Sequence, residues 1–440
     1  MLDRQQRPNA KVASDGIARL DVGGIGDFLL EAMARYADHP VRHVVPVAHG
    51  AAAAVIVDDA LAFAPFDYEQ TLPADVLGEY RTLRPPFAET GSPALPNGLN
   101  LGAQLLWMER VYPAAMERGT ILPWAQYWAW FLSGESVSEA TSLGCHTDLW
   151  RPEGAQFSSL ASSRGWDRSF APLARAGDAV GPLRPEIAER TGLPGGVTVL
   201  AGLHDSNAAL LAARGFAEYT DSEATVLSTG TWFVAMRLAR DAALGSQLPA
   251  GRDCLVNVDA YGQAVPSARF MGGREIETLI GTDPRPVDIG SDQTELLAAV
   301  GTVLADQIMV LPTLAPGCGP YPDGTGRWMS LPGSGNERRA AACLYAALVA
   351  DRSLELIGSK GRLLIEGRFA RADVFVRALA ALRPAMQVHV ASAHNDVSFG
   401  AMRLIDPALR PVSKLRRVEP LAADLVAYRT RWRDEIAVPA

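Results

Sequence analysis

The sequence predicts an α/β protein built from two domains. Segments rich in β-branched residues alternate with segments of helical apolar spacing along most of the chain. A length of 440 residues exceeds what a single hydrophobic core usually supports. Glycine and proline punctuate residues 181–196, "GPLRPEIAERTGLPGG", where we expect the chain to pass between its halves. The expected domains are therefore residues 1–195 and residues 196–440.

The first half of the chain contains strands and helices in alternation. Runs of β-branched and small apolar residues predict strands over 41–50 and 51–59. Apolar residues at helical spacing predict helices over 26–39, 99–113 and 122–134. Gly134 is expected to end the last of these helices, since glycine readily adopts the left-handed conformation that closes a helix.

The second half continues this alternation. The expected strands are 196–200, a pair within 223–238, 307–314, 361–369 with its turn, and 386–394. The expected helices are 207–214, 336–358 and 372–384. Because ligands of α/β proteins gather beside the carboxyl ends of strands, polar residues at those ends are the first candidates for a site.

Composition excludes several classes of partner. A net charge of −8 argues against a nucleic-acid partner, which needs a basic face. The longest apolar stretches, such as "AAAAVIV" (51–57), are too short to span a membrane, and the first residues lack the apolar centre of a signal peptide. The four cysteines lie far apart, which is typical of free thiols in a cytoplasmic protein.

The segment "AGLHDSNAAL" (201–210) places an acid and an imidazole on a tight strand-to-helix turn. His204 and Asp205 have almost no bulk around them. Asp205 could cap the following helix, or both side chains could face a ligand that comes close to the backbone. Both interpretations remain open from these residues alone.

The segment "LSTGTW" (227–232) is a turn rich in hydroxyl groups between two expected strands. Ser228, Thr229 and Thr231 surround Gly230. A polar hairpin turn with a permissive glycine explains this pattern. A phosphate cradle, built from backbone N–H groups and threonine hydroxyls, explains it as well.

The segment "LLIEGRFARADVF" (363–375) is a strand that turns at Gly367 into a helix. Such a turn allows a flat ring to approach the backbone, and Phe369 could then cover one face of that ring. A plain strand-to-helix turn is the alternative explanation.

Two weaker polar signals lie in the first half. His49 and Gly50 end the strand 41–50, where a histidine is either a ligand contact or a satisfied core group. Asn100 and Gln104 lie four residues apart on one helix face. Their amides could reach a polyol together, or the face could simply be solvated.

The order of these segments resembles the FGGY family of carbohydrate kinases. His-Gly at a strand end is followed by His-Asp-Ser, then by Ser-Thr-Gly-Thr-Trp, then by a late glycine turn before a helix. The resemblance extends from about residue 40 to residue 405, and "GLHDSNAA" with "LSTGTW" is its most specific part. It implies an α/β, two-domain actin-like ATPase (ribonuclease H-like) fold with an interdomain cleft.

The resemblance also implies roles for individual residues. It makes Asp205 the catalytic base that takes a proton from the sugar hydroxyl, with His204, His49, Gly50, Asn100 and Gln104 on the sugar. It gives Ser228, Thr229, Gly230 and Thr231 to phosphate binding, and Gly367, Arg368, Phe369 and Ala370 to adenosine binding. Mg²⁺ would be held through the ATP phosphates or by Asp205.

The implied activity is transfer of the γ-phosphate of ATP to a ketose. "NLGAQL" (100–105) is similar to rhamnulokinase-like members, and "SEATSLGCHTDLW" (138–150) is loosely similar to a segment near the sugar. They favour a 6-deoxy-ketohexose such as L-fuculose, with L-rhamnulose or xylulose as alternatives. The expected partners are the sugar and ATP, and the resemblance allows a homodimer.

One family feature is expected to be absent from this chain. Family members begin with a β-hairpin whose Asp-x-Gly-x-Thr loop holds phosphates and metal, whereas "MLDRQQRPNAKV" is similar only to the end of that hairpin. The segment "LDVGGIG" (20–26) precedes an expected helix and does not replace the loop. Either the start codon was assigned too late, or this protein only binds sugar or nucleotide. Translating the DNA just upstream in frame distinguishes these two explanations, because a late start codon would leave an Asp-x-Gly-x-Thr hairpin encoded there.

Overall fold

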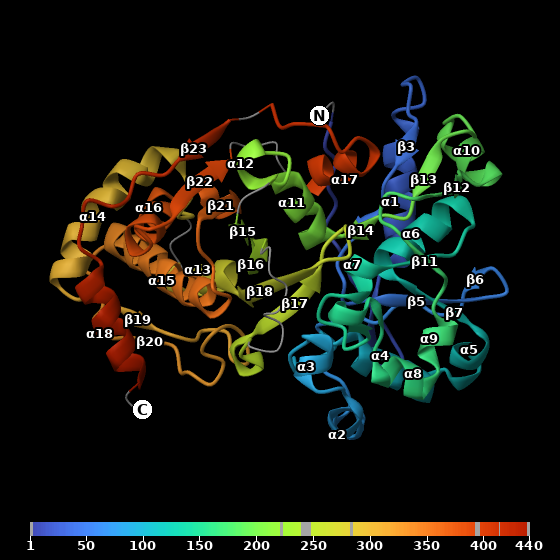
Figure 1. Ribbon diagram of the computed structural model, residues 1–440, viewed down its shortest axis with the longest axis horizontal. Helices are drawn as coiled ribbons and strands as arrows, with labels where there is room; N and C mark the ends of the chain where they lie inside the picture. The colour runs from blue at the N-terminus through green and yellow to red at the C-terminus, as the bar shows by residue number, and fades with distance from the viewer. Residues whose placement is uncertain are drawn as a thin grey trace. The chain divides into compact units, whose positions relative to one another are not determined.

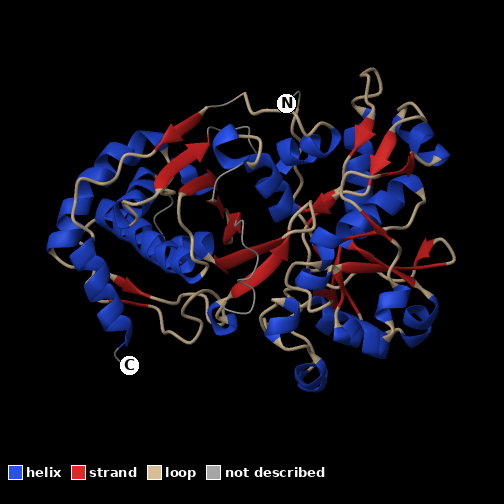
Figure 2. Ribbon diagram, in the orientation of Figure 1, coloured by secondary structure: helices blue, strands red, loops and turns tan. Residues whose placement is uncertain are grey.

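The computed structural model describes residues 3–220, 223–238, 248–281, 285–391, 397–412 and 414–437. The chain forms two compact units, and each mixes helices with strands (Figures 1 and 2). Unit 1 comprises Met1–Ala212, Val256–Ala264 and Val397–Leu409, and unit 2 comprises Ala213–Leu255, Val265–Asp396 and Arg410–Ala440. The α/β prediction is confirmed. The resemblance also implies that residues 1–195 form the sugar-binding domain and residues 196–440 the ATP-binding domain, and this division stays a prediction.

Unit 1 contains several small sheets covered by helices. Its strands are β1 Lys11–Ser14, β2 Ile17–Leu20, β3 His43–Val44, β4 Val47–Ala48, β5 Ala53–Val57, β6 Ala60–Leu61, β7 Thr120–Pro123, β8 Ser138–Glu139, β9 Trp150–Arg151, β10 Gln156–Phe157, β11 Leu173–Ala174, β12 Ala179–Pro182, β13 Thr198–Leu200 and β14 Leu203–His204. Its helices are α1 Val22–Ala34, α2 Ala74–Leu83, α3 Phe87–Thr90, α4 Leu101–Val111, α5 Pro113–Arg118, α6 Trp124–Ser133, α7 Ala140–Leu143, α8 Ser159–Arg164, α9 Trp166–Ser169, α10 Pro185–Thr191, α17 Val397–Ile405 and nearly all of α11 Asp205–Ala213.

The structure confirms the predicted strand 51–59 as β5 and the predicted helices as α1, α4 and α6, with shifted ends, whereas the predicted strand 41–50 is divided into β3 and β4, which belong to different sheets. Helix α1 begins four residues before the predicted range 26–39, because the Asp21 side chain caps it by accepting a hydrogen bond from the Gly24 N–H at 3.0 Å. The segment "LDVGGIG" (20–26) was expected to precede the helix, but its residues 22–26 form the first part of α1. Helix α6 ends at Gly134, which has the left-handed φ of 86°.

The hairpin of β1 and β2 was not among the predicted elements. Its two strands pair in register from Lys11↔Leu20 to Ser14↔Ile17. Asp15 and Gly16 form the two-residue loop with φ values of 54° and 75°. Asp-Gly between short alternating segments is the usual signal for such a tight hairpin, so the sequence did carry this information.

Unit 2 is organised on one sheet with strand order β17-β18-β16-β15-β21-β22-β23 (Figure 1). The strands of this sheet are β15 Ala224–Thr229, β16 Phe233–Leu238, β17 Cys254–Val258, β18 Ala264–Phe270, β21 Arg362–Gly367, β22 Gln387–Ala391 and β23 Leu415–Arg417, of which Val256–Val258 and Ala264 are counted with unit 1. A separate pair is formed by β19 Val310–Leu311 and β20 Arg327–Trp328. The helices are α12 Ala217–Thr220, α13 Gly272–Ile280, α14 Gln293–Ala305, α15 Gly335–Leu356, α16 Asp373–Leu382 and α18 Val426–Ala437.

The predicted strand pair within 223–238 and the predicted helices 336–358 and 372–384 are confirmed as β15, β16, α15 and α16. The predicted strand 307–314 is reduced to the two residues of β19. The predicted strand 386–394 is confirmed as β22 up to Ala391, and residues 392–394 lie outside the described residues.

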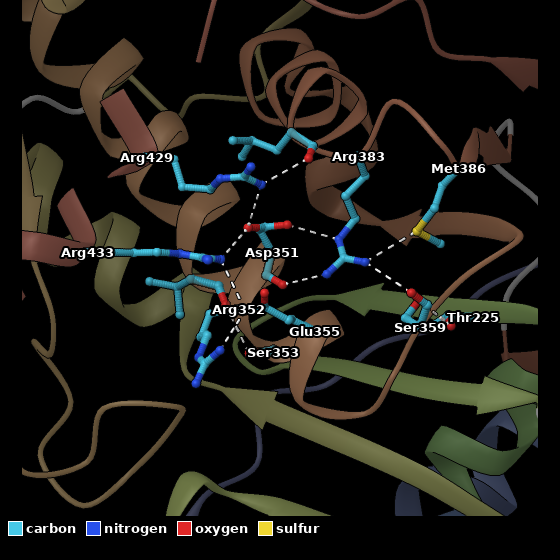
Figure 3. Close-up of polar contacts among 12 residues, drawn as sticks. Thr225, Asp351, Arg352, Ser353, Glu355, Ser359, Arg383, Met386, Arg429 and Arg433 are labelled. Carbon is cyan, nitrogen blue, oxygen red and sulfur yellow. Dashed lines mark hydrogen bonds and ion pairs between the residues drawn. The ribbon is translucent and has the colours of Figure 1, made fainter. Parts of the chain in front are cut away.

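A buried carboxylate on α15 joins three parts of unit 2. Figure 3 shows Asp351 at the centre of arginines that come from the end of α16 and from α18. Arg383 Nε lies 3.0 Å from Asp351 Oδ1, while Arg429 Nη1 and Arg433 Nη2 lie 3.4 and 3.1 Å from Oδ2. Burial lowers the pKa of Arg383 against the pull of the two carboxylates near it. The cluster fastens α18 to α15 and α16.

Candidate functional site

The first cluster of predicted site residues lies at two adjacent strand ends in unit 1. Strands β4 and β14 pair in parallel, with Leu203 opposite Val47 and His204 opposite Ala48. His49 and Asp205 each follow directly after one of these strands. The carboxyl ends of parallel strands meet at one edge, so the two segments that the sequence singled out 155 residues apart are neighbours here.

Asp205 has the exposure that a reacting group needs. It is the first residue of α11, and its side chain is 47% exposed. Its Oδ1 accepts hydrogen bonds from the backbone N–H of Ser206 at 2.6 Å and from the Ser206 hydroxyl at 3.3 Å. The helix-start interpretation and the ligand interpretation are therefore compatible, because one carboxylate oxygen serves the turn while the side chain remains accessible.

His204 is buried and holds the Asp205 carboxylate from one side. Its Nε2 lies 3.2 Å from Asp205 Oδ1, and the side-chain amide nitrogen of Asn207 lies 3.3 Å from its Nδ1. An amide N–H donates, so Nδ1 accepts and Nε2 carries the proton that points toward Asp205. The imidazole thereby orients the carboxylate.

His49 lies in the same cluster, in contact with Tyr68. The two rings meet edge to face with centroids 5.3 Å apart. Burial lowers the pKa of His49, and the negative charge of Asp205 opposes that shift. His49 Nδ1 is buried without a hydrogen-bond partner among the described residues. A neutral imidazole with an unused ring nitrogen is suited to contact a sugar hydroxyl.

Gly50 is required by close packing beside this histidine. A Cβ atom at position 50 would lie 2.3 Å from Cys145 Sγ and 3.3 Å from His204 Cδ2. No side chain fits there without moving the turn. The glycine therefore allows β4 and β14 to end beside one another.

Asn100 and Gln104 are fully buried in unit 1, and their amides already contact the backbone. Asn100 Nδ2 donates to the carbonyl oxygens of His146 at 2.9 Å and Pro93 at 3.0 Å, and its Oδ1 accepts from the Leu95 N–H. Gln104 Nε2 donates to the Ala51 carbonyl at 2.8 Å, just after the His49–Gly50 turn. These contacts give both amides a role in holding loops. Their direct contact with sugar stays a prediction.

The second cluster of predicted residues lies in unit 2, again at two parallel strand ends. Strands β15 and β21 pair in parallel, and Thr229 lies opposite Gly367. The Thr229 hydroxyl donates to the Glu366 carbonyl and accepts from the Phe369 N–H at 3.1 Å. A Cβ at Gly367, whose φ is 84°, would lie 2.2 Å from the Thr229 carbonyl oxygen. Thr229 and Gly367 thus join the two predicted nucleotide-binding turns.

The turn over residues 228–231 is open to a ligand. Thr231 is exposed, and a Cβ at Gly230 would meet only the Trp232 carbonyl oxygen, at 3.9 Å. The Gly230 N–H itself donates to that carbonyl at 3.0 Å. Ser228 is half-buried. An exposed hydroxyl over an unobstructed glycine is a surface that the oxygens of a phosphate can approach.

The turn after Gly367 differs from its predicted arrangement in one respect. The Phe369 ring is only 1% exposed and packs against Phe233 with centroids 5.1 Å apart, so it lies in the core. Ala370 is buried as well. Arg368 is 42% exposed and pairs with Asp288 at 3.2 Å and Glu277 at 3.4 Å. Of these residues, Arg368 has the side chain that an adenosine group could reach.

Two residues near these clusters, Gln126 and Gly273, were not indicated by the sequence motifs, whereas Glu139 and Thr141 lie in the loosely similar segment 138–150. Thr141 contacts the His204 backbone and Glu139 contacts Thr141, while Gln126 Nε2 donates to the Ala201 carbonyl at 3.0 Å just before the His204 segment. In unit 2, a Cβ at Gly273 would lie 2.1 Å from the Gly230 carbonyl oxygen, so the start of α13 touches the 228–231 turn. The double glycine at 272–273 was a visible signal of close approach. Gln126 has no local signal.

The described residues contain neither a group of metal-binding side chains nor a membrane-spanning helix. Across the described ranges, no three His, Cys, Asp or Glu side chains gather as a group that could hold a metal ion. Every helix in the part of the chain that the structure describes is too short or too polar to traverse a membrane.

Comparison with known proteins identifies the class to which this fold belongs. A crystal structure of a carbohydrate kinase from Novosphingobium aromaticivorans is 63% identical, covers 99% of this chain and 95% of its own chain, and superposes with a TM-score of 0.92. The xylulose kinase from Rhodospirillum rubrum is 18% identical over 97% of this chain and 91% of its own, with a TM-score of 0.76. The fold is the two-domain actin-like ATPase fold of sugar kinases.

Sequence comparison gives the particular family. The family described as carbohydrate kinase FGGY, C-terminal domain, matches residues 221–412. L-fuculokinase from Salmonella typhi is 30% identical over 166 residues, which are 34% of this chain and 32% of that protein. The match thus spans about a third of the length of this relative. With the close structural relative, these findings show that the chain belongs to the FGGY family of carbohydrate kinases.

Proposed function

We propose that this protein is an ATP-dependent sugar kinase that transfers the γ-phosphate of ATP to a hydroxyl group of a ketose. The observation that carries the proposal is the accessible carboxylate of Asp205 at the carboxyl end of β14, beside His49 at the end of β4. Membership of the FGGY family supports the reaction class. We take a 6-deoxy-ketohexose such as L-fuculose as the substrate, because relatives include an L-fuculokinase. L-rhamnulose and xylulose are the alternatives.

In this proposal Asp205 is the general base. Its carboxylate accepts the proton of the attacking sugar hydroxyl, and His204 keeps it oriented through the 3.2 Å contact from Nε2. His49 offers its buried ring nitrogen to another sugar hydroxyl. Removal of the proton makes the hydroxyl oxygen a better nucleophile toward phosphorus.

The nucleotide is assigned to the turns of unit 2. The exposed Thr231 hydroxyl and the open surface over Gly230 suit phosphate oxygens, and Arg368 suits the adenosine side. Mg²⁺ accompanies the phosphates, where it neutralises charge during transfer. The four cysteines are all free and buried, which fits the proposed cytoplasmic location. A homodimer stays a prediction.

An assay of ADP release tests the proposal. The chain, and the product of its whole reading frame, are assayed with MgATP against L-fuculose, L-rhamnulose and D-xylulose. We expect turnover with one of them, and a loss of about 10²–10⁴-fold in kcat for Asp205→Asn with sugar binding retained, because a positioned base contributes that much.

Two outcomes contradict the proposal. Absence of turnover from folded protein that still binds a sugar or nucleotide by calorimetry would identify a non-catalytic binding protein of kinase ancestry. Full activity of Asp205→Asn would remove Asp205 from the chemistry. Arg190→Gln, on an exposed ion pair with Asp27 in unit 1, is the matched surface control and should keep the activity of the native chain.

A further inference from the structure

We infer that Glu139 and Thr141 are positioning residues for Asp205, and that they act on it through the backbone of His204. The inference deepens the proposed function and rests on it, since it assigns a role to residues that serve the same carboxylate. Neither residue contacts the Asp205 carboxylate, whose hydrogen-bond and ion-pair partners are Ser206 and His204. Both lie in unit 1 on the β8–α7 segment.

Glu139 is a buried acceptor at the start of α7. It is only 2% exposed. Its Oε1 accepts from the Thr141 N–H at 2.9 Å, and its Oε2 accepts from the Ser142 N–H at 3.1 Å and the Thr141 hydroxyl at 2.6 Å. Burial raises the pKa of Glu139 to about 7, against the lowering effect of these hydrogen bonds. Both carboxyl oxygens are therefore occupied as acceptors.

Thr141 links Glu139 by hydrogen bonds to the strand that leads to Asp205. Its hydroxyl accepts a hydrogen bond from the backbone N–H of His204 at 2.9 Å. A hydroxyl has one proton, and an N–H can only donate. The Thr141 proton must then point to Glu139, which fixes the direction of the whole chain of bonds. Glu139, Thr141 and His204 form one continuous connection of two hydrogen bonds.

The strand that receives this bond is short. β14 contains two residues, and within the described part of the chain its sheet has one other strand, the two-residue β4. The side chain of Thr141 thus supplies a partner that a longer sheet would have supplied to the His204 N–H. Asp205 is the next residue, so a shift of the His204 backbone moves its carboxylate directly. Positioning errors of about 1 Å cost catalysis more than they cost binding.

A purely structural explanation is that Glu139 caps a four-residue helix and that Thr141 fills space. The two explanations predict opposite orders for two substitutions. Thr141→Val keeps the shape and removes the hydroxyl, whereas Thr141→Ser keeps the hydroxyl and removes a methyl group. If the hydroxyl matters, the valine variant is the more impaired in kcat. If packing matters, the serine variant has the lower kcat.

The experiment compares these variants at pH 8, with the sugar that gives the highest turnover in the native chain. We expect kcat per folded molecule to fall about 2- to 10-fold in Thr141→Val, the range that one net hydrogen bond supports, with little change in the KM for sugar. Thr141→Ser should stay close to the native value. Glu139→Gln should behave like the valine variant, because an amide cannot accept at both oxygen positions.

Thr191→Val is the matched control. Thr191 is also a buried threonine of unit 1, and its hydroxyl donates to the Ile187 carbonyl at 2.7 Å within α10. The loss of that hydroxyl should affect stability without affecting kcat. A native kcat in both Thr141→Val and Glu139→Gln, or a serine variant weaker than the valine variant, would overturn the inference.

A second readout works without turnover. Hydrogen exchange of the His204 amide reports the bond to Thr141 directly, and it should be about 2- to 10-fold faster in Thr141→Val than in the native chain. Unchanged exchange would overturn the inference by itself. Failure of the proposed function has a different signature, because Asp205→Asn would then equal the native chain in activity whatever the Thr141 variants do.

Discussion

The carboxyl group of Glu139 lies where its ionised form costs free energy. Burial raises its pKa to about 7 from an ordinary value of 4.5, so the folded chain holds this proton more tightly than the unfolded chain does. The stability it contributes is fully present below pH 4.5 and is lost as pH rises through 7. The shift corresponds to about 3 kcal/mol.

We predict that this pH dependence disappears with Glu139→Gln. Between pH 4.5 and pH 8, the unfolding free energy of the native chain should fall by about 3 kcal/mol relative to the unfolding free energy of the variant. Thermal unfolding at a series of pH values measures it. The control variant Glu186→Gln replaces the carboxylate of a side chain that is 65% exposed, and its difference from the native chain should stay constant. A constant difference for Glu139→Gln would contradict the prediction.

At the scale of elements, the Asp351 cluster contributes to the attachment of α18 to the rest of unit 2. The Asp351 side chain is only 4% exposed and faces Arg383, Arg429 and Arg433 (Figure 3). Removing one partner of a buried ion pair leaves uncompensated charge, which costs about 3–5 kcal/mol. The cluster thus adds to the attachment of α18 that the buried Tyr428 and Trp432 also provide.

We predict that Asp351→Asn lowers the unfolding free energy by about 3 kcal/mol or more and speeds hydrogen exchange in α18. Glu355→Gln is the matched control, because Glu355 contacts Arg352 and Arg433 from a side chain that is 44% exposed. That variant should cost at most about 1 kcal/mol. Equal melting temperatures for the two variants would show that the Asp351 cluster does not carry the packing of α18.

At the scale of the whole molecule, the proposed assignment of sugar to unit 1 and nucleotide to unit 2 predicts which unit each ligand protects. A ligand at 100 times its dissociation constant stabilises its site by about 2.7 kcal/mol. Sugar alone should therefore protect amides near 49–51 and 203–206, in unit 1. MgATP alone should protect amides near 228–231 and 367–370, in unit 2.

Hydrogen exchange followed by mass spectrometry measures this protection peptide by peptide. The native chain is compared without ligand, with each sugar of the panel and with MgATP. Protection of the 228–231 segment by sugar alone, with none near 203–206, would reverse the predicted assignment. Helix α10, Pro185–Thr191, serves as an internal reference, since no ligand is assigned to it.

The order of motifs carried most of the functional information in the sequence. The α/β class, the turns around Asp205 and Thr229, and the helix end at Gly134 could all be predicted, because each depends on residues close together in the chain. Local spacing determines helices, strands and tight turns, so local sequence suffices to predict them.

Only the tertiary structure decided which side chains meet. Thr141 and His204 are 63 residues apart, and no local pattern marks their hydrogen bond. Phe369 has the same chemistry in a core as beside a nucleotide, and its burial against Phe233 depends on how β16 and β21 share one sheet. Strand pairing across long separations sets these contacts, and a residue's neighbours along the chain carry no information about its partner in another strand or helix.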